Sequence, residues 1–370
     1  MQIPFVSFDK TNNTIRSEVL KSFEHFFDKQ SYVLGEEVKK FERAYANFNN
    51  VTECIGVSNG LDALHIALKT LEIKEGDEVI LPSNTYIATV LAISYTGAKP
   101  IFVEPNINTY NLDINKIEDA ITPKTKCIMP VHLYGQACEM DDIMHISEKY
   151  KLNVVEDNAQ AQGASYKGKM TGSFGIINAT SFYPGKNLGA LGDAGAVTTN
   201  DTLLAEKASI LRNYGSAKKY SNEVIGFNMR LDEFQATMLN IKLAYLNDWS
   251  KERQQIAKWY HEELKEVDEI ILPHIASNST SVYHLFVIRV KKREALQKYL
   301  NNRGISTLIH YPIPPHLQKA YQHLGYKKGD FPIAESLADS CLSLPMYIGL
   351  SKEEIHFIVK TIKEFIVNCF

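Results

Sequence analysis

The chain has 370 residues, of which 45% are hydrophobic and 22% charged, and its net charge of −3 is ordinary for a folded protein of about two domains. The charge gives no sign of a nucleic-acid partner, and without a signal peptide or a long apolar run we expect no membrane partner. Five scattered cysteines, none at metal-binding spacing, favour a reduced cytoplasmic setting and no metal site.

In the first half of the chain, short apolar segments alternate with segments that carry apolar residues at helical spacing. The expected helices are 15–28, 35–47, 61–71, 86–95, 140–149 and 201–213. The expected strands are 53–57, 78–81, 100–103, 127–131, 153–156, 179–183 and 196–199. This alternation predicts an α/β domain with a mostly parallel sheet covered on both faces. Ligands bind beyond the carboxyl ends of the strands in such sheets.

From about Leu231 the pattern changes. The expected elements are two long helices over 231–246 and 249–267 with a break at Asp248, strands 283–290 and 306–309, and helices 293–303, 332–340 and 351–368. We therefore predict a large domain over residues 1–245 and a smaller C-terminal α+β domain over residues 246–370.

The stretch from Ser181 to Gly195 places one lysine, Lys186, on a glycine-rich turn directly after an expected strand. An amine held on such a turn is typical of a Schiff-base lysine, which must be partly desolvated to be neutral and nucleophilic. A phosphate loop is excluded, because Thr180 and Asn187 stand where that motif needs glycine and a hydroxyl residue. From this stretch alone, a solvated loop lysine remains the alternative.

Other positions would complete a pyridoxal phosphate site around such a lysine. Asp157 directly follows an expected strand and could hold the protonated ring nitrogen, or it could cap the next helix. The Ser58–Gly60 turn opens a helix and could bind a phosphate, or it could serve only as a cap. Ser181 could donate its hydroxyl to the same phosphate, and Tyr86 could stack on the ring or only pack.

These positions lie in stretches that resemble the sugar aminotransferases of the DegT/DnrJ/StrS family, which are pyridoxal phosphate enzymes of aminotransferase fold type I. The matching stretches are 32–35 (YVLG), 57–64 (VSNGLDAL), 76–86 (GDEVILPSNTY), 156–164 (EDNAQAQGA), 181–190 (SFYPGKNLGA), 212–215 (RNYG), 226–236 (GFNMRLDEFQA), 310–312 (HYP) and 343–347 (SLPMY). They span nearly the whole chain in the family's order and spacing. The resemblance implies a large domain with a mixed, mostly parallel sheet between helices, followed by a smaller α+β domain.

By this resemblance, Lys186 forms the Schiff base with pyridoxal phosphate and shuttles the proton during transamination. Related sugar dehydratases carry histidine at this position, so the lysine disfavours that branch of the family. Asp157 matches the partner of the pyridine nitrogen, and Gln160 matches the residue near the ring hydroxyl. Tyr86 remains the candidate for stacking on the ring.

The resemblance also implies how the phosphate is held. Gly60, Leu61 and Ser181 match the family's phosphate contacts, although many members have threonine where this chain has Leu61, so only its backbone contact carries over. Asn228 matches an asparagine that reaches the phosphate from the second subunit, which implies a homodimer with shared active sites. Many members have histidine where this chain has Gln162, whose role is left unassigned.

Tyr183 indicates a subgroup, because members that read Ser-Phe-Tyr-Pro-Gly-Lys resemble enzymes that aminate C3 of nucleotide-linked 3-keto-6-deoxy sugars. The resemblance therefore implies a transaminase that moves the amino group of L-glutamate to C3 of a dTDP-3-keto-6-deoxyhexose, for a deoxyamino sugar of an O-antigen or S-layer glycan. The expected substrate-binding residues are Tyr183, His310, Tyr311, Arg212 and Arg230, with Lys218 and Lys219 as further candidates for the diphosphate.

Two other functions stay open. One is amination at C4 of a nucleotide-linked 4-keto-6-deoxy sugar, which differs only in the carbon attacked. The other is a non-catalytic, regulatory protein that binds pyridoxal phosphate. Such a protein would need an effector module, typically a basic helix-turn-helix, for which we see no spare length. The complete set of lysine, aspartate and glutamine positions also favours catalysis.

Overall fold

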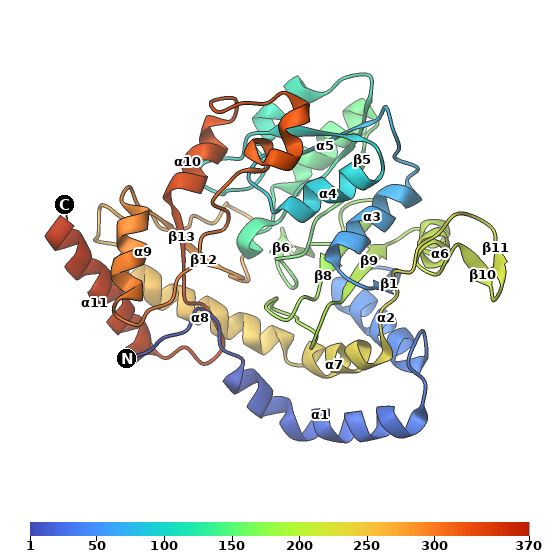
Figure 1. The fold of residues 1–370 in the computed structure, drawn as a ribbon, viewed down its shortest axis with the longest axis horizontal. Helices are drawn as coiled ribbons and strands as arrows, with labels where there is room; N and C mark the ends of the chain where they lie inside the picture. The colour runs from blue at the N-terminus through green and yellow to red at the C-terminus, as the bar shows by residue number, and fades with distance from the viewer. Residues whose placement is uncertain (370) are drawn as a thin grey trace.

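The computed structural model describes residues 1–369, and Figure 1 shows how its helices and strands follow one another. The helices are α1 (Asp9–Lys29), α2 (Glu36–Asn49), α3 (Gly60–Thr70), α4 (Ile87–Tyr95), α5 (Met140–Tyr150), α6 (Thr202–Leu211), α7 (Glu233–Leu243), α8 (Leu246–Leu264), α9 (Arg293–Asn301), α10 (Pro332–Ser340) and α11 (Lys352–Cys369). The strands are β1 (Glu53–Val57), β2 (Glu78–Pro82), β3 (Lys99–Val103), β4 (Thr125–Ile128), β5 (Asn153–Val154), β6 (Ser165–Tyr166), β7 (Lys169–Met170), β8 (Asn178–Ser181), β9 (Gly195–Thr199), β10 (Ser216–Lys218), β11 (Ser221–Asn222), β12 (Phe286–Arg289) and β13 (Cys341–Leu344). Short 3-10 helices lie at η1 (Ile114–Lys116), η2 (Glu118–Ala120), η3 (Leu133–Gly135), η4 (Pro315–Leu317) and η5 (Lys319–Leu324).

The strands of the first half form two sheets, in the orders β3-β2-β4-β5 and β8-β9-β1, which meet edge to edge between β5 and β8. The pairs β2–β3, β2–β4 and β4–β5 are parallel. The Ala179 N–H joins β8 to the end of β5 by donating to the Glu156 carbonyl (2.9 Å), next to a parallel bridge between Ala179 and Asp157. Among these strands, β9 runs antiparallel to both β8 and β1. The predicted mostly parallel sheet is confirmed.

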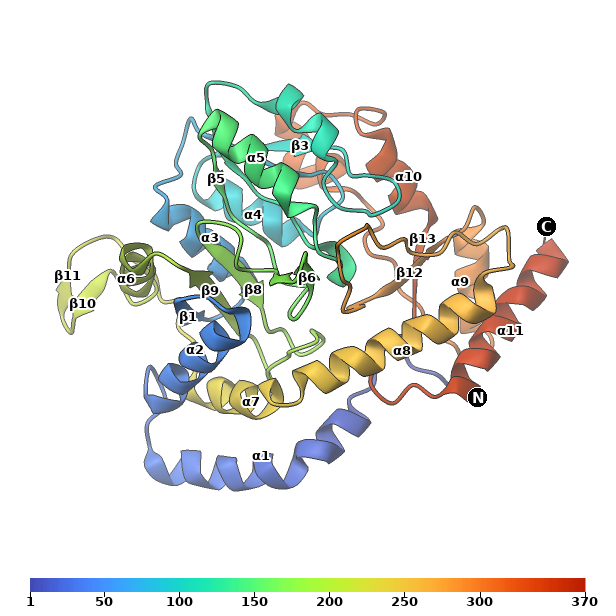
Figure 2. The same ribbon diagram turned by 180° about the vertical axis from the view of Figure 1, so that it is seen from behind.

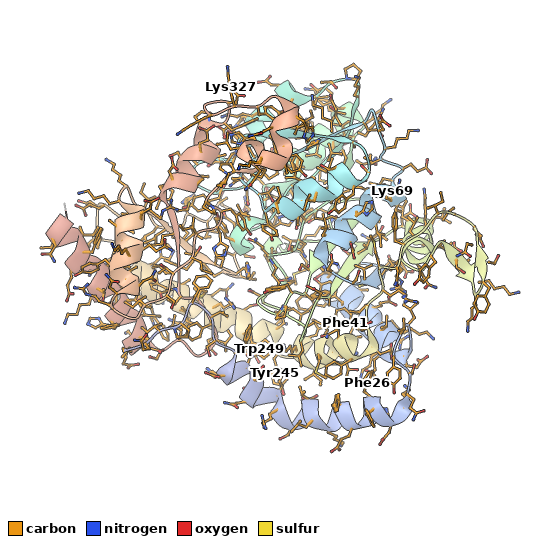
Figure 3. The ribbon with its side chains drawn as sticks, in the orientation of Figure 1. Phe26, Phe41, Lys69, Tyr245, Trp249 and Lys327 are labelled. Atoms are coloured by element: carbon orange, nitrogen blue, oxygen red, sulfur yellow. The ribbon has the colours of Figure 1, made fainter. Side chains whose placement is uncertain are left out.

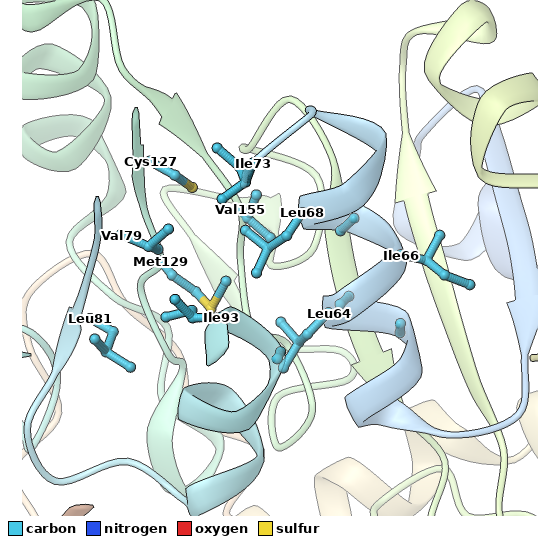
Figure 4. Packing of buried hydrophobic residues seen from close by; sticks show 14 of the residues in the cluster. Leu64, Ile66, Leu68, Ile73, Val79, Leu81, Ile93, Cys127, Met129 and Val155 are labelled. Atoms are coloured by element: carbon cyan, nitrogen blue, oxygen red, sulfur yellow. The ribbon is translucent and has the colours of Figure 1, made fainter. Parts of the chain in front are cut away.

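Helices cover both faces of this sheet (Figures 1 and 2). On one face, Leu64 and Leu68 of α3 and Ile93 of α4 pack against Val79 and Met129 of the sheet layer (Figure 4). Alternate strand residues face α2, α5 and α7 on the other side. Because successive strand side chains point to opposite faces, a doubly covered sheet requires nearly continuous apolar strands. Each fully buried Leu or Ile contributes roughly 1.5–3 kcal/mol of transfer free energy.

The C-terminal elements form a second hydrophobic cluster, in which α8, α9 and α11 pack around the antiparallel pair β12–β13. The N-terminal segment joins it, because the Ile3 N–H donates to the Gly304 carbonyl (2.8 Å) and the Ile3 carbonyl accepts from the Ser306 N–H (2.9 Å). The N-terminus and α11 therefore lie on the same side of the molecule (Figure 1). The predicted boundary at residues 245 and 246 falls where α8 begins, and the extent of each domain stays a prediction.

The break expected at Asp248 is wrong, because Asp248 lies inside the first turn of α8. An acidic residue in that turn interacts favourably with the partial positive charge of the helix N-terminus. The chain instead changes direction at Ala244 and Tyr245, between α7 and α8. Figure 3 shows Tyr245 and Trp249 at this junction, where their rings stack with centroids 5.6 Å apart.

The strand expected over 306–309 is also wrong. Leu308 makes one antiparallel bridge with Ser343 and the ladder does not continue. The prolines that follow supply no N–H donors, which prevents further pairing. Other expected elements are confirmed in type, although α1 begins six residues before the expected start at Ile15 and β5 ends at Val154. Within residues 1–369, no helix is long and apolar enough to cross a membrane.

Candidate active site

The predicted lysine sits on a tight turn beyond β8, which we call the lysine turn (Tyr183–Gly189). The Lys186 N–H donates to the Tyr183 carbonyl (2.8 Å), and the Ala190 N–H donates to the Phe182 carbonyl (2.8 Å) to close the turn. Lys186 is half-buried. Burial lowers the pKa of its amine to about 8, against the opposing attraction of Asp157. The solvated-lysine alternative is therefore not supported, because a solvated amine would keep the ordinary pKa of 10.5.

Asp157 follows β5 at the same edge of the sheet. Its carboxylate is buried and accepts hydrogen bonds from the Thr89 hydroxyl (2.8 Å) and the Ala159 N–H (3.1 Å). Burial raises its pKa, while the two hydrogen bonds and the nearby Lys186 act in the opposite direction. No helix follows Asp157 directly in the described chain, so it does not cap one. The described residues also give it no ion pair at contact distance, which leaves a buried carboxylate that lacks a cation.

The N-terminus of α3 lies against the end of β8. A Cβ added to Gly60 would lie 2.5 Å from the Ser181 Cβ, so this approach requires glycine. The Asn59 side chain caps the Asp62 N–H (2.8 Å). Within the described residues, the Gly60 and Leu61 N–H groups have no acceptor. The turn is therefore a helix cap and also presents free N–H groups beside the Ser181 hydroxyl, as an anion site does.

Gln160 connects the site to the C-terminal elements. Its Oε1 accepts from the Tyr134 N–H (2.7 Å), and its Nε2 donates to the Tyr311 hydroxyl (3.1 Å). Tyr311 in turn packs against Tyr86, with ring centroids 5.0 Å apart. These contacts fix the amide of Gln160 and bring Tyr86 and Tyr311 together.

Two histidines flank the amine of Lys186. His310 bonds the Ser343 hydroxyl through Nδ1 (2.8 Å), and burial together with the nearby Lys186 lowers its pKa to about 4. Burial, Lys186 and His310 also hold the pKa of His284 well below its usual range. Both rings are thus neutral at neutral pH. Sequence reasoning missed His284, because nothing near it in the chain marks it as close to Lys186.

Gln162 receives a structural role. Its Nε2 donates to the Ser181 carbonyl (2.6 Å) and to the Ala159 carbonyl (3.2 Å). The side chain thus braces the end of β8 against the segment that follows Asp157.

The prediction that Arg212 binds the substrate is wrong. It is buried, and its guanidinium donates to the Glu42 carboxylate and to the Gly56 carbonyl, both at 2.5 Å. Glu42 also accepts from the Gly56 N–H (2.8 Å). Arg212 therefore anchors β1 from within the protein and is not free to hold a diphosphate.

The remaining cationic candidates and Asn228 lie on an arm, residues 213–230, that includes β10 and β11 and projects from the large domain (Figure 1). Asn228 is exposed and forms an isolated bridge with Asn213. The Arg230 guanidinium lies over the Tyr214 ring, 5.3 Å from its centroid. Lys218 and Lys219 are exposed. Among the described residues, no hydrogen bond or ion pair joins this arm to Lys186 or Asp157.

Comparison with known proteins places this arrangement in a family. The chain matches the sequence profile of the DegT/DnrJ/EryC1/StrS aminotransferase family over residues 13–363. The chain belongs to this family. The aminotransferase is 51% identical, over 98% of its length and 99% of the relative's, to the dTDP-3-amino-3,6-dideoxy-alpha-D-galactopyranose transaminase of Aneurinibacillus thermoaerophilus. It is 45% identical, with the same coverage, to the erythromycin biosynthesis sensory transduction protein EryC1 of Saccharopolyspora erythraea.

Solved structures agree with the predicted α/β aminotransferase fold. DesV of S. venezuelae, solved in complex with a ketimine intermediate, superposes with a TM-score of 0.97 at 43% identity, covering 99% of this aminotransferase and 98% of DesV. NtdA of Bacillus subtilis, solved with the bound cofactor PMP (pyridoxamine phosphate), gives a TM-score of 0.93 at 32% identity, covering 99% and 85% of the two chains. The predicted fold class is confirmed.

Proposed function

We propose that this aminotransferase carries pyridoxal phosphate on Lys186 and transfers the amino group of L-glutamate to C3 of a dTDP-3-keto-6-deoxyhexose. The product would be a dTDP-3-amino-3,6-dideoxyhexose. The observation that carries the proposal is the meeting of a half-buried amine of lowered pKa, Lys186, and a buried carboxylate, Asp157, at one edge of the sheet. Such opposed pKa shifts are typical of catalytic sites.

The side chains at this edge fit the cofactor on three counts. The buried carboxylate of Asp157 lacks a cation among the residues that the structure describes, and a protonated pyridine nitrogen would supply one. The free N–H groups of Gly60 and Leu61, beside the Ser181 hydroxyl, match a phosphate group at a helix N-terminus. The Lys186 amine, with its pKa lowered to about 8, is nucleophilic enough to condense with an aldehyde.

When bound, pyridoxal phosphate supplies a ring that takes up the electron pair released at the reacting carbon. Asp157 would keep the ring nitrogen protonated, and the Thr89 hydroxyl and Ala159 N–H hold its carboxylate in one orientation. Gln160 is held by the Tyr134 N–H and by Tyr311, so its amide would lie in a fixed position near the ring hydroxyl.

Lys186 would move the protons. Its Nζ would take a proton from Cα of glutamate in the first half-reaction and deliver one to C3 of the sugar in the second. A pKa of about 8 makes both forms of the amine accessible near neutral pH, as a group that is base and then acid requires. His284 and His310 stay neutral, so they can donate and accept hydrogen bonds at the substrate without adding charge.

The exposed arm supports a homodimer. Because Asn228 makes no contact with the site of its own chain within the described residues, it is free to reach the phosphate in a second subunit. Arg230, Lys218 and Lys219 lie on the same arm and would come with it to the substrate diphosphate. A reducing, cytoplasmic location is supported by the free, buried thiols of Cys54, Cys127, Cys138 and Cys341.

Amination at C3 is supported by Tyr183, which directly precedes the Pro-Gly-Lys of the lysine turn, and by the name of the Aneurinibacillus relative. The test is a panel of 3-keto and 4-keto sugar nucleotides, with glutamate as donor and the product identified by NMR. We expect turnover of the dTDP-linked 3-keto sugar and an amine at C3. A product aminated at C4 would overturn the regiochemistry.

A regulatory protein is the second candidate, because one relative carries the name of a sensory transduction protein. Adding glutamate without a keto sugar distinguishes an enzyme from a regulatory protein. An enzyme should lose the visible absorbance of its lysine-bound cofactor and release 2-oxoglutarate, whereas a sensor should do neither. Lys186→Ala serves as the control and should be inactive. If this variant turns over both substrates at nearly the wild-type rate, the role of Lys186 is wrong.

A further inference from the structure

Two side chains of α7 bind the backbone just beyond Lys186. The Lys242 Nζ donates to the Gly189 carbonyl (2.7 Å), and the Gln235 Oε1 accepts from the Leu191 N–H (2.8 Å). Residues seven apart lie about two turns apart on the same face of a helix. One face of α7 therefore supplies both a donor and an acceptor to the same short piece of chain.

The lysine turn needs such outside support. Between its own residues the structure gives one backbone hydrogen bond, from the Lys186 N–H to the Tyr183 carbonyl (2.8 Å). Gly189 lies so close to the Pro184 carbonyl that an added Cβ would collide with it. The absence of a side chain permits this approach, but it also leaves the backbone free to adopt other conformations. Contacts from outside the turn must remove that freedom.

Asn187 provides a third anchor on the opposite side. Its Nδ2 donates to the Val282 carbonyl (2.9 Å), which ties the turn to the chain segment that leads to His284. The turn is thus held between the C-terminal elements and α7. Loss of the α7 contacts would leave the turn held by the Asn187 contact and by the bond from the Ala190 N–H to the Phe182 carbonyl at its base.

Burial of the Lys242 amine would destabilise the fold without any benefit if this side chain served only for packing. It is 6% exposed, it forms no ion pair within residues 1–369, and burial lowers its pKa to about 8. A buried cation without an acidic partner destabilises a fold, and an apolar side chain of similar length would fill the same space without that cost. What methionine could not do at this position is donate to Gly189.

We propose that Lys242 and Gln235 are positioning residues that set the direction of the Lys186 amine through the backbone of the lysine turn. The inference rests on the proposed function for the role of Lys186. A misplacement of about 1 Å near a reacting centre can lower a rate by about 10²-fold. Loss of either anchor should therefore lower kcat at least about tenfold, with a smaller change in KM.

The experiment compares Lys242→Met, Gln235→Leu and Gln235→Glu with the wild-type holoenzyme. Lys251→Met is the matched control, because Lys251 lies on α8, with its side chain 76% exposed and paired with Asp248. We measure kcat and KM for glutamate, the pH midpoint of the visible absorbance of the lysine-bound cofactor, its uptake rate by the cofactor-free protein, and the thermal midpoint.

We expect Lys242→Met to lower kcat, to shift the absorbance midpoint and to slow cofactor uptake, while its thermal midpoint is unchanged or higher. Gln235→Leu should lower kcat in the same way. Gln235→Glu keeps an acceptor for the Leu191 N–H and should stay close to wild type, as should the control.

Wild-type kcat and absorbance midpoint in Lys242→Met would overturn the inference. The inference would also be overturned if kcat fell only in proportion to the thermal midpoint, and equally in Gln235→Leu and Gln235→Glu. That result would show that these side chains support the fold in general. If the wild-type protein binds no cofactor at Lys186, the proposed function fails together with the inference. A normal adduct in a variant that behaves as wild type refutes the inference alone.

Discussion

Replacing Lys186 with methionine should stabilise the cofactor-free protein, although it removes the proposed catalytic amine. Burial lowers the pKa of this amine from 10.5 to about 8. One pKa unit corresponds to about 1.36 kcal/mol, so the charged amine costs the folded state about 3 kcal/mol. Methionine fills a similar volume without a charge. At neutral pH, the free energy of unfolding of Lys186→Met should therefore exceed that of the wild type by about 3 kcal/mol.

The pH dependence of this difference has a definite sign. In the unfolded chain Lys186 keeps its proton up to the ordinary pKa of 10.5, whereas in the folded protein it releases the proton near 8. Between these values the unfolded state binds more protons, so the wild-type free energy of unfolding rises with pH. The advantage of Lys186→Met should be complete below pH 8 and should disappear by pH 10.5.

Urea unfolding of the cofactor-free proteins, followed by tryptophan fluorescence at a series of pH values, measures this difference. Lys251→Met, at an exposed site on α8, is the control and should match the wild type. The reasoning is refuted if Lys186→Met is no more stable than the wild type at neutral pH. A stability difference that does not shrink as the pH rises would refute it as well.

Three further predictions concern the groups around Lys186. Asp157→Asn keeps the shape of the side chain but removes its charge. The buried pair that Asp157 would form with the ring nitrogen is worth about 2–5 kcal/mol, so kcat for release of 2-oxoglutarate from glutamate should fall at least about 10²-fold. A wild-type kcat would show that the ring nitrogen needs no carboxylate. Gly60→Ala puts a Cβ 2.5 Å from the Ser181 Cβ. It should weaken cofactor binding at least about tenfold, or about 1.4 kcal/mol, in a fluorescence titration, and an unchanged Kd would mean that the phosphate binds elsewhere. Thr89→Val removes a hydrogen bond worth about 1 kcal/mol that stabilises the charged form of Asp157. The pKa of Asp157 should rise further, and the acid limb of the kcat profile should move to higher pH. An acid limb that stays in place would argue against this role of Thr89.

The meeting of Asp157 and Lys186 could be predicted because both follow strands directly. Apolar runs over 153–156 and 179–183 marked those strands, and neighbouring strands of a mostly parallel sheet end at one edge. The sequence placed Gly60 at the same edge for the same reason. A local pattern is sufficient here, since the topology of such sheets leaves few alternatives.

Pairing between distant residues could not be predicted in this way. Arg212 was expected at the substrate, yet it bonds Glu42, 170 residues away, beneath β1. Lys242 and His284 carried no local signal, because their importance comes from contacts with the lysine turn and with Lys186. A sequence shows which side chains carry charge, but the fold decides which of these charges are neutralised.

The difference between buried charges that have a partner and those that lack one is evidence about where the ligand binds. Within residues 1–369, the buried ion pair of Arg212 with Glu42 is complete, and so is the contact of His132 with Glu156 (2.9 Å). Asp157 and Lys186, in contrast, have no ion-pair partner at contact distance in the described part of the chain. Among the described residues, Lys242 and Arg253 are also buried without an ion pair, but each donates to backbone carbonyls, whereas the Lys186 amine has no hydrogen-bond partner. Unpaired buried charges destabilise a fold, so two such groups of opposite charge at one sheet edge are hard to explain by packing alone. One cofactor would give both groups a partner, because its cationic ring nitrogen would pair with Asp157 and its aldehyde would react with the Lys186 amine. Folding and cofactor binding are then coupled, because a ligand that binds only the folded state stabilises it.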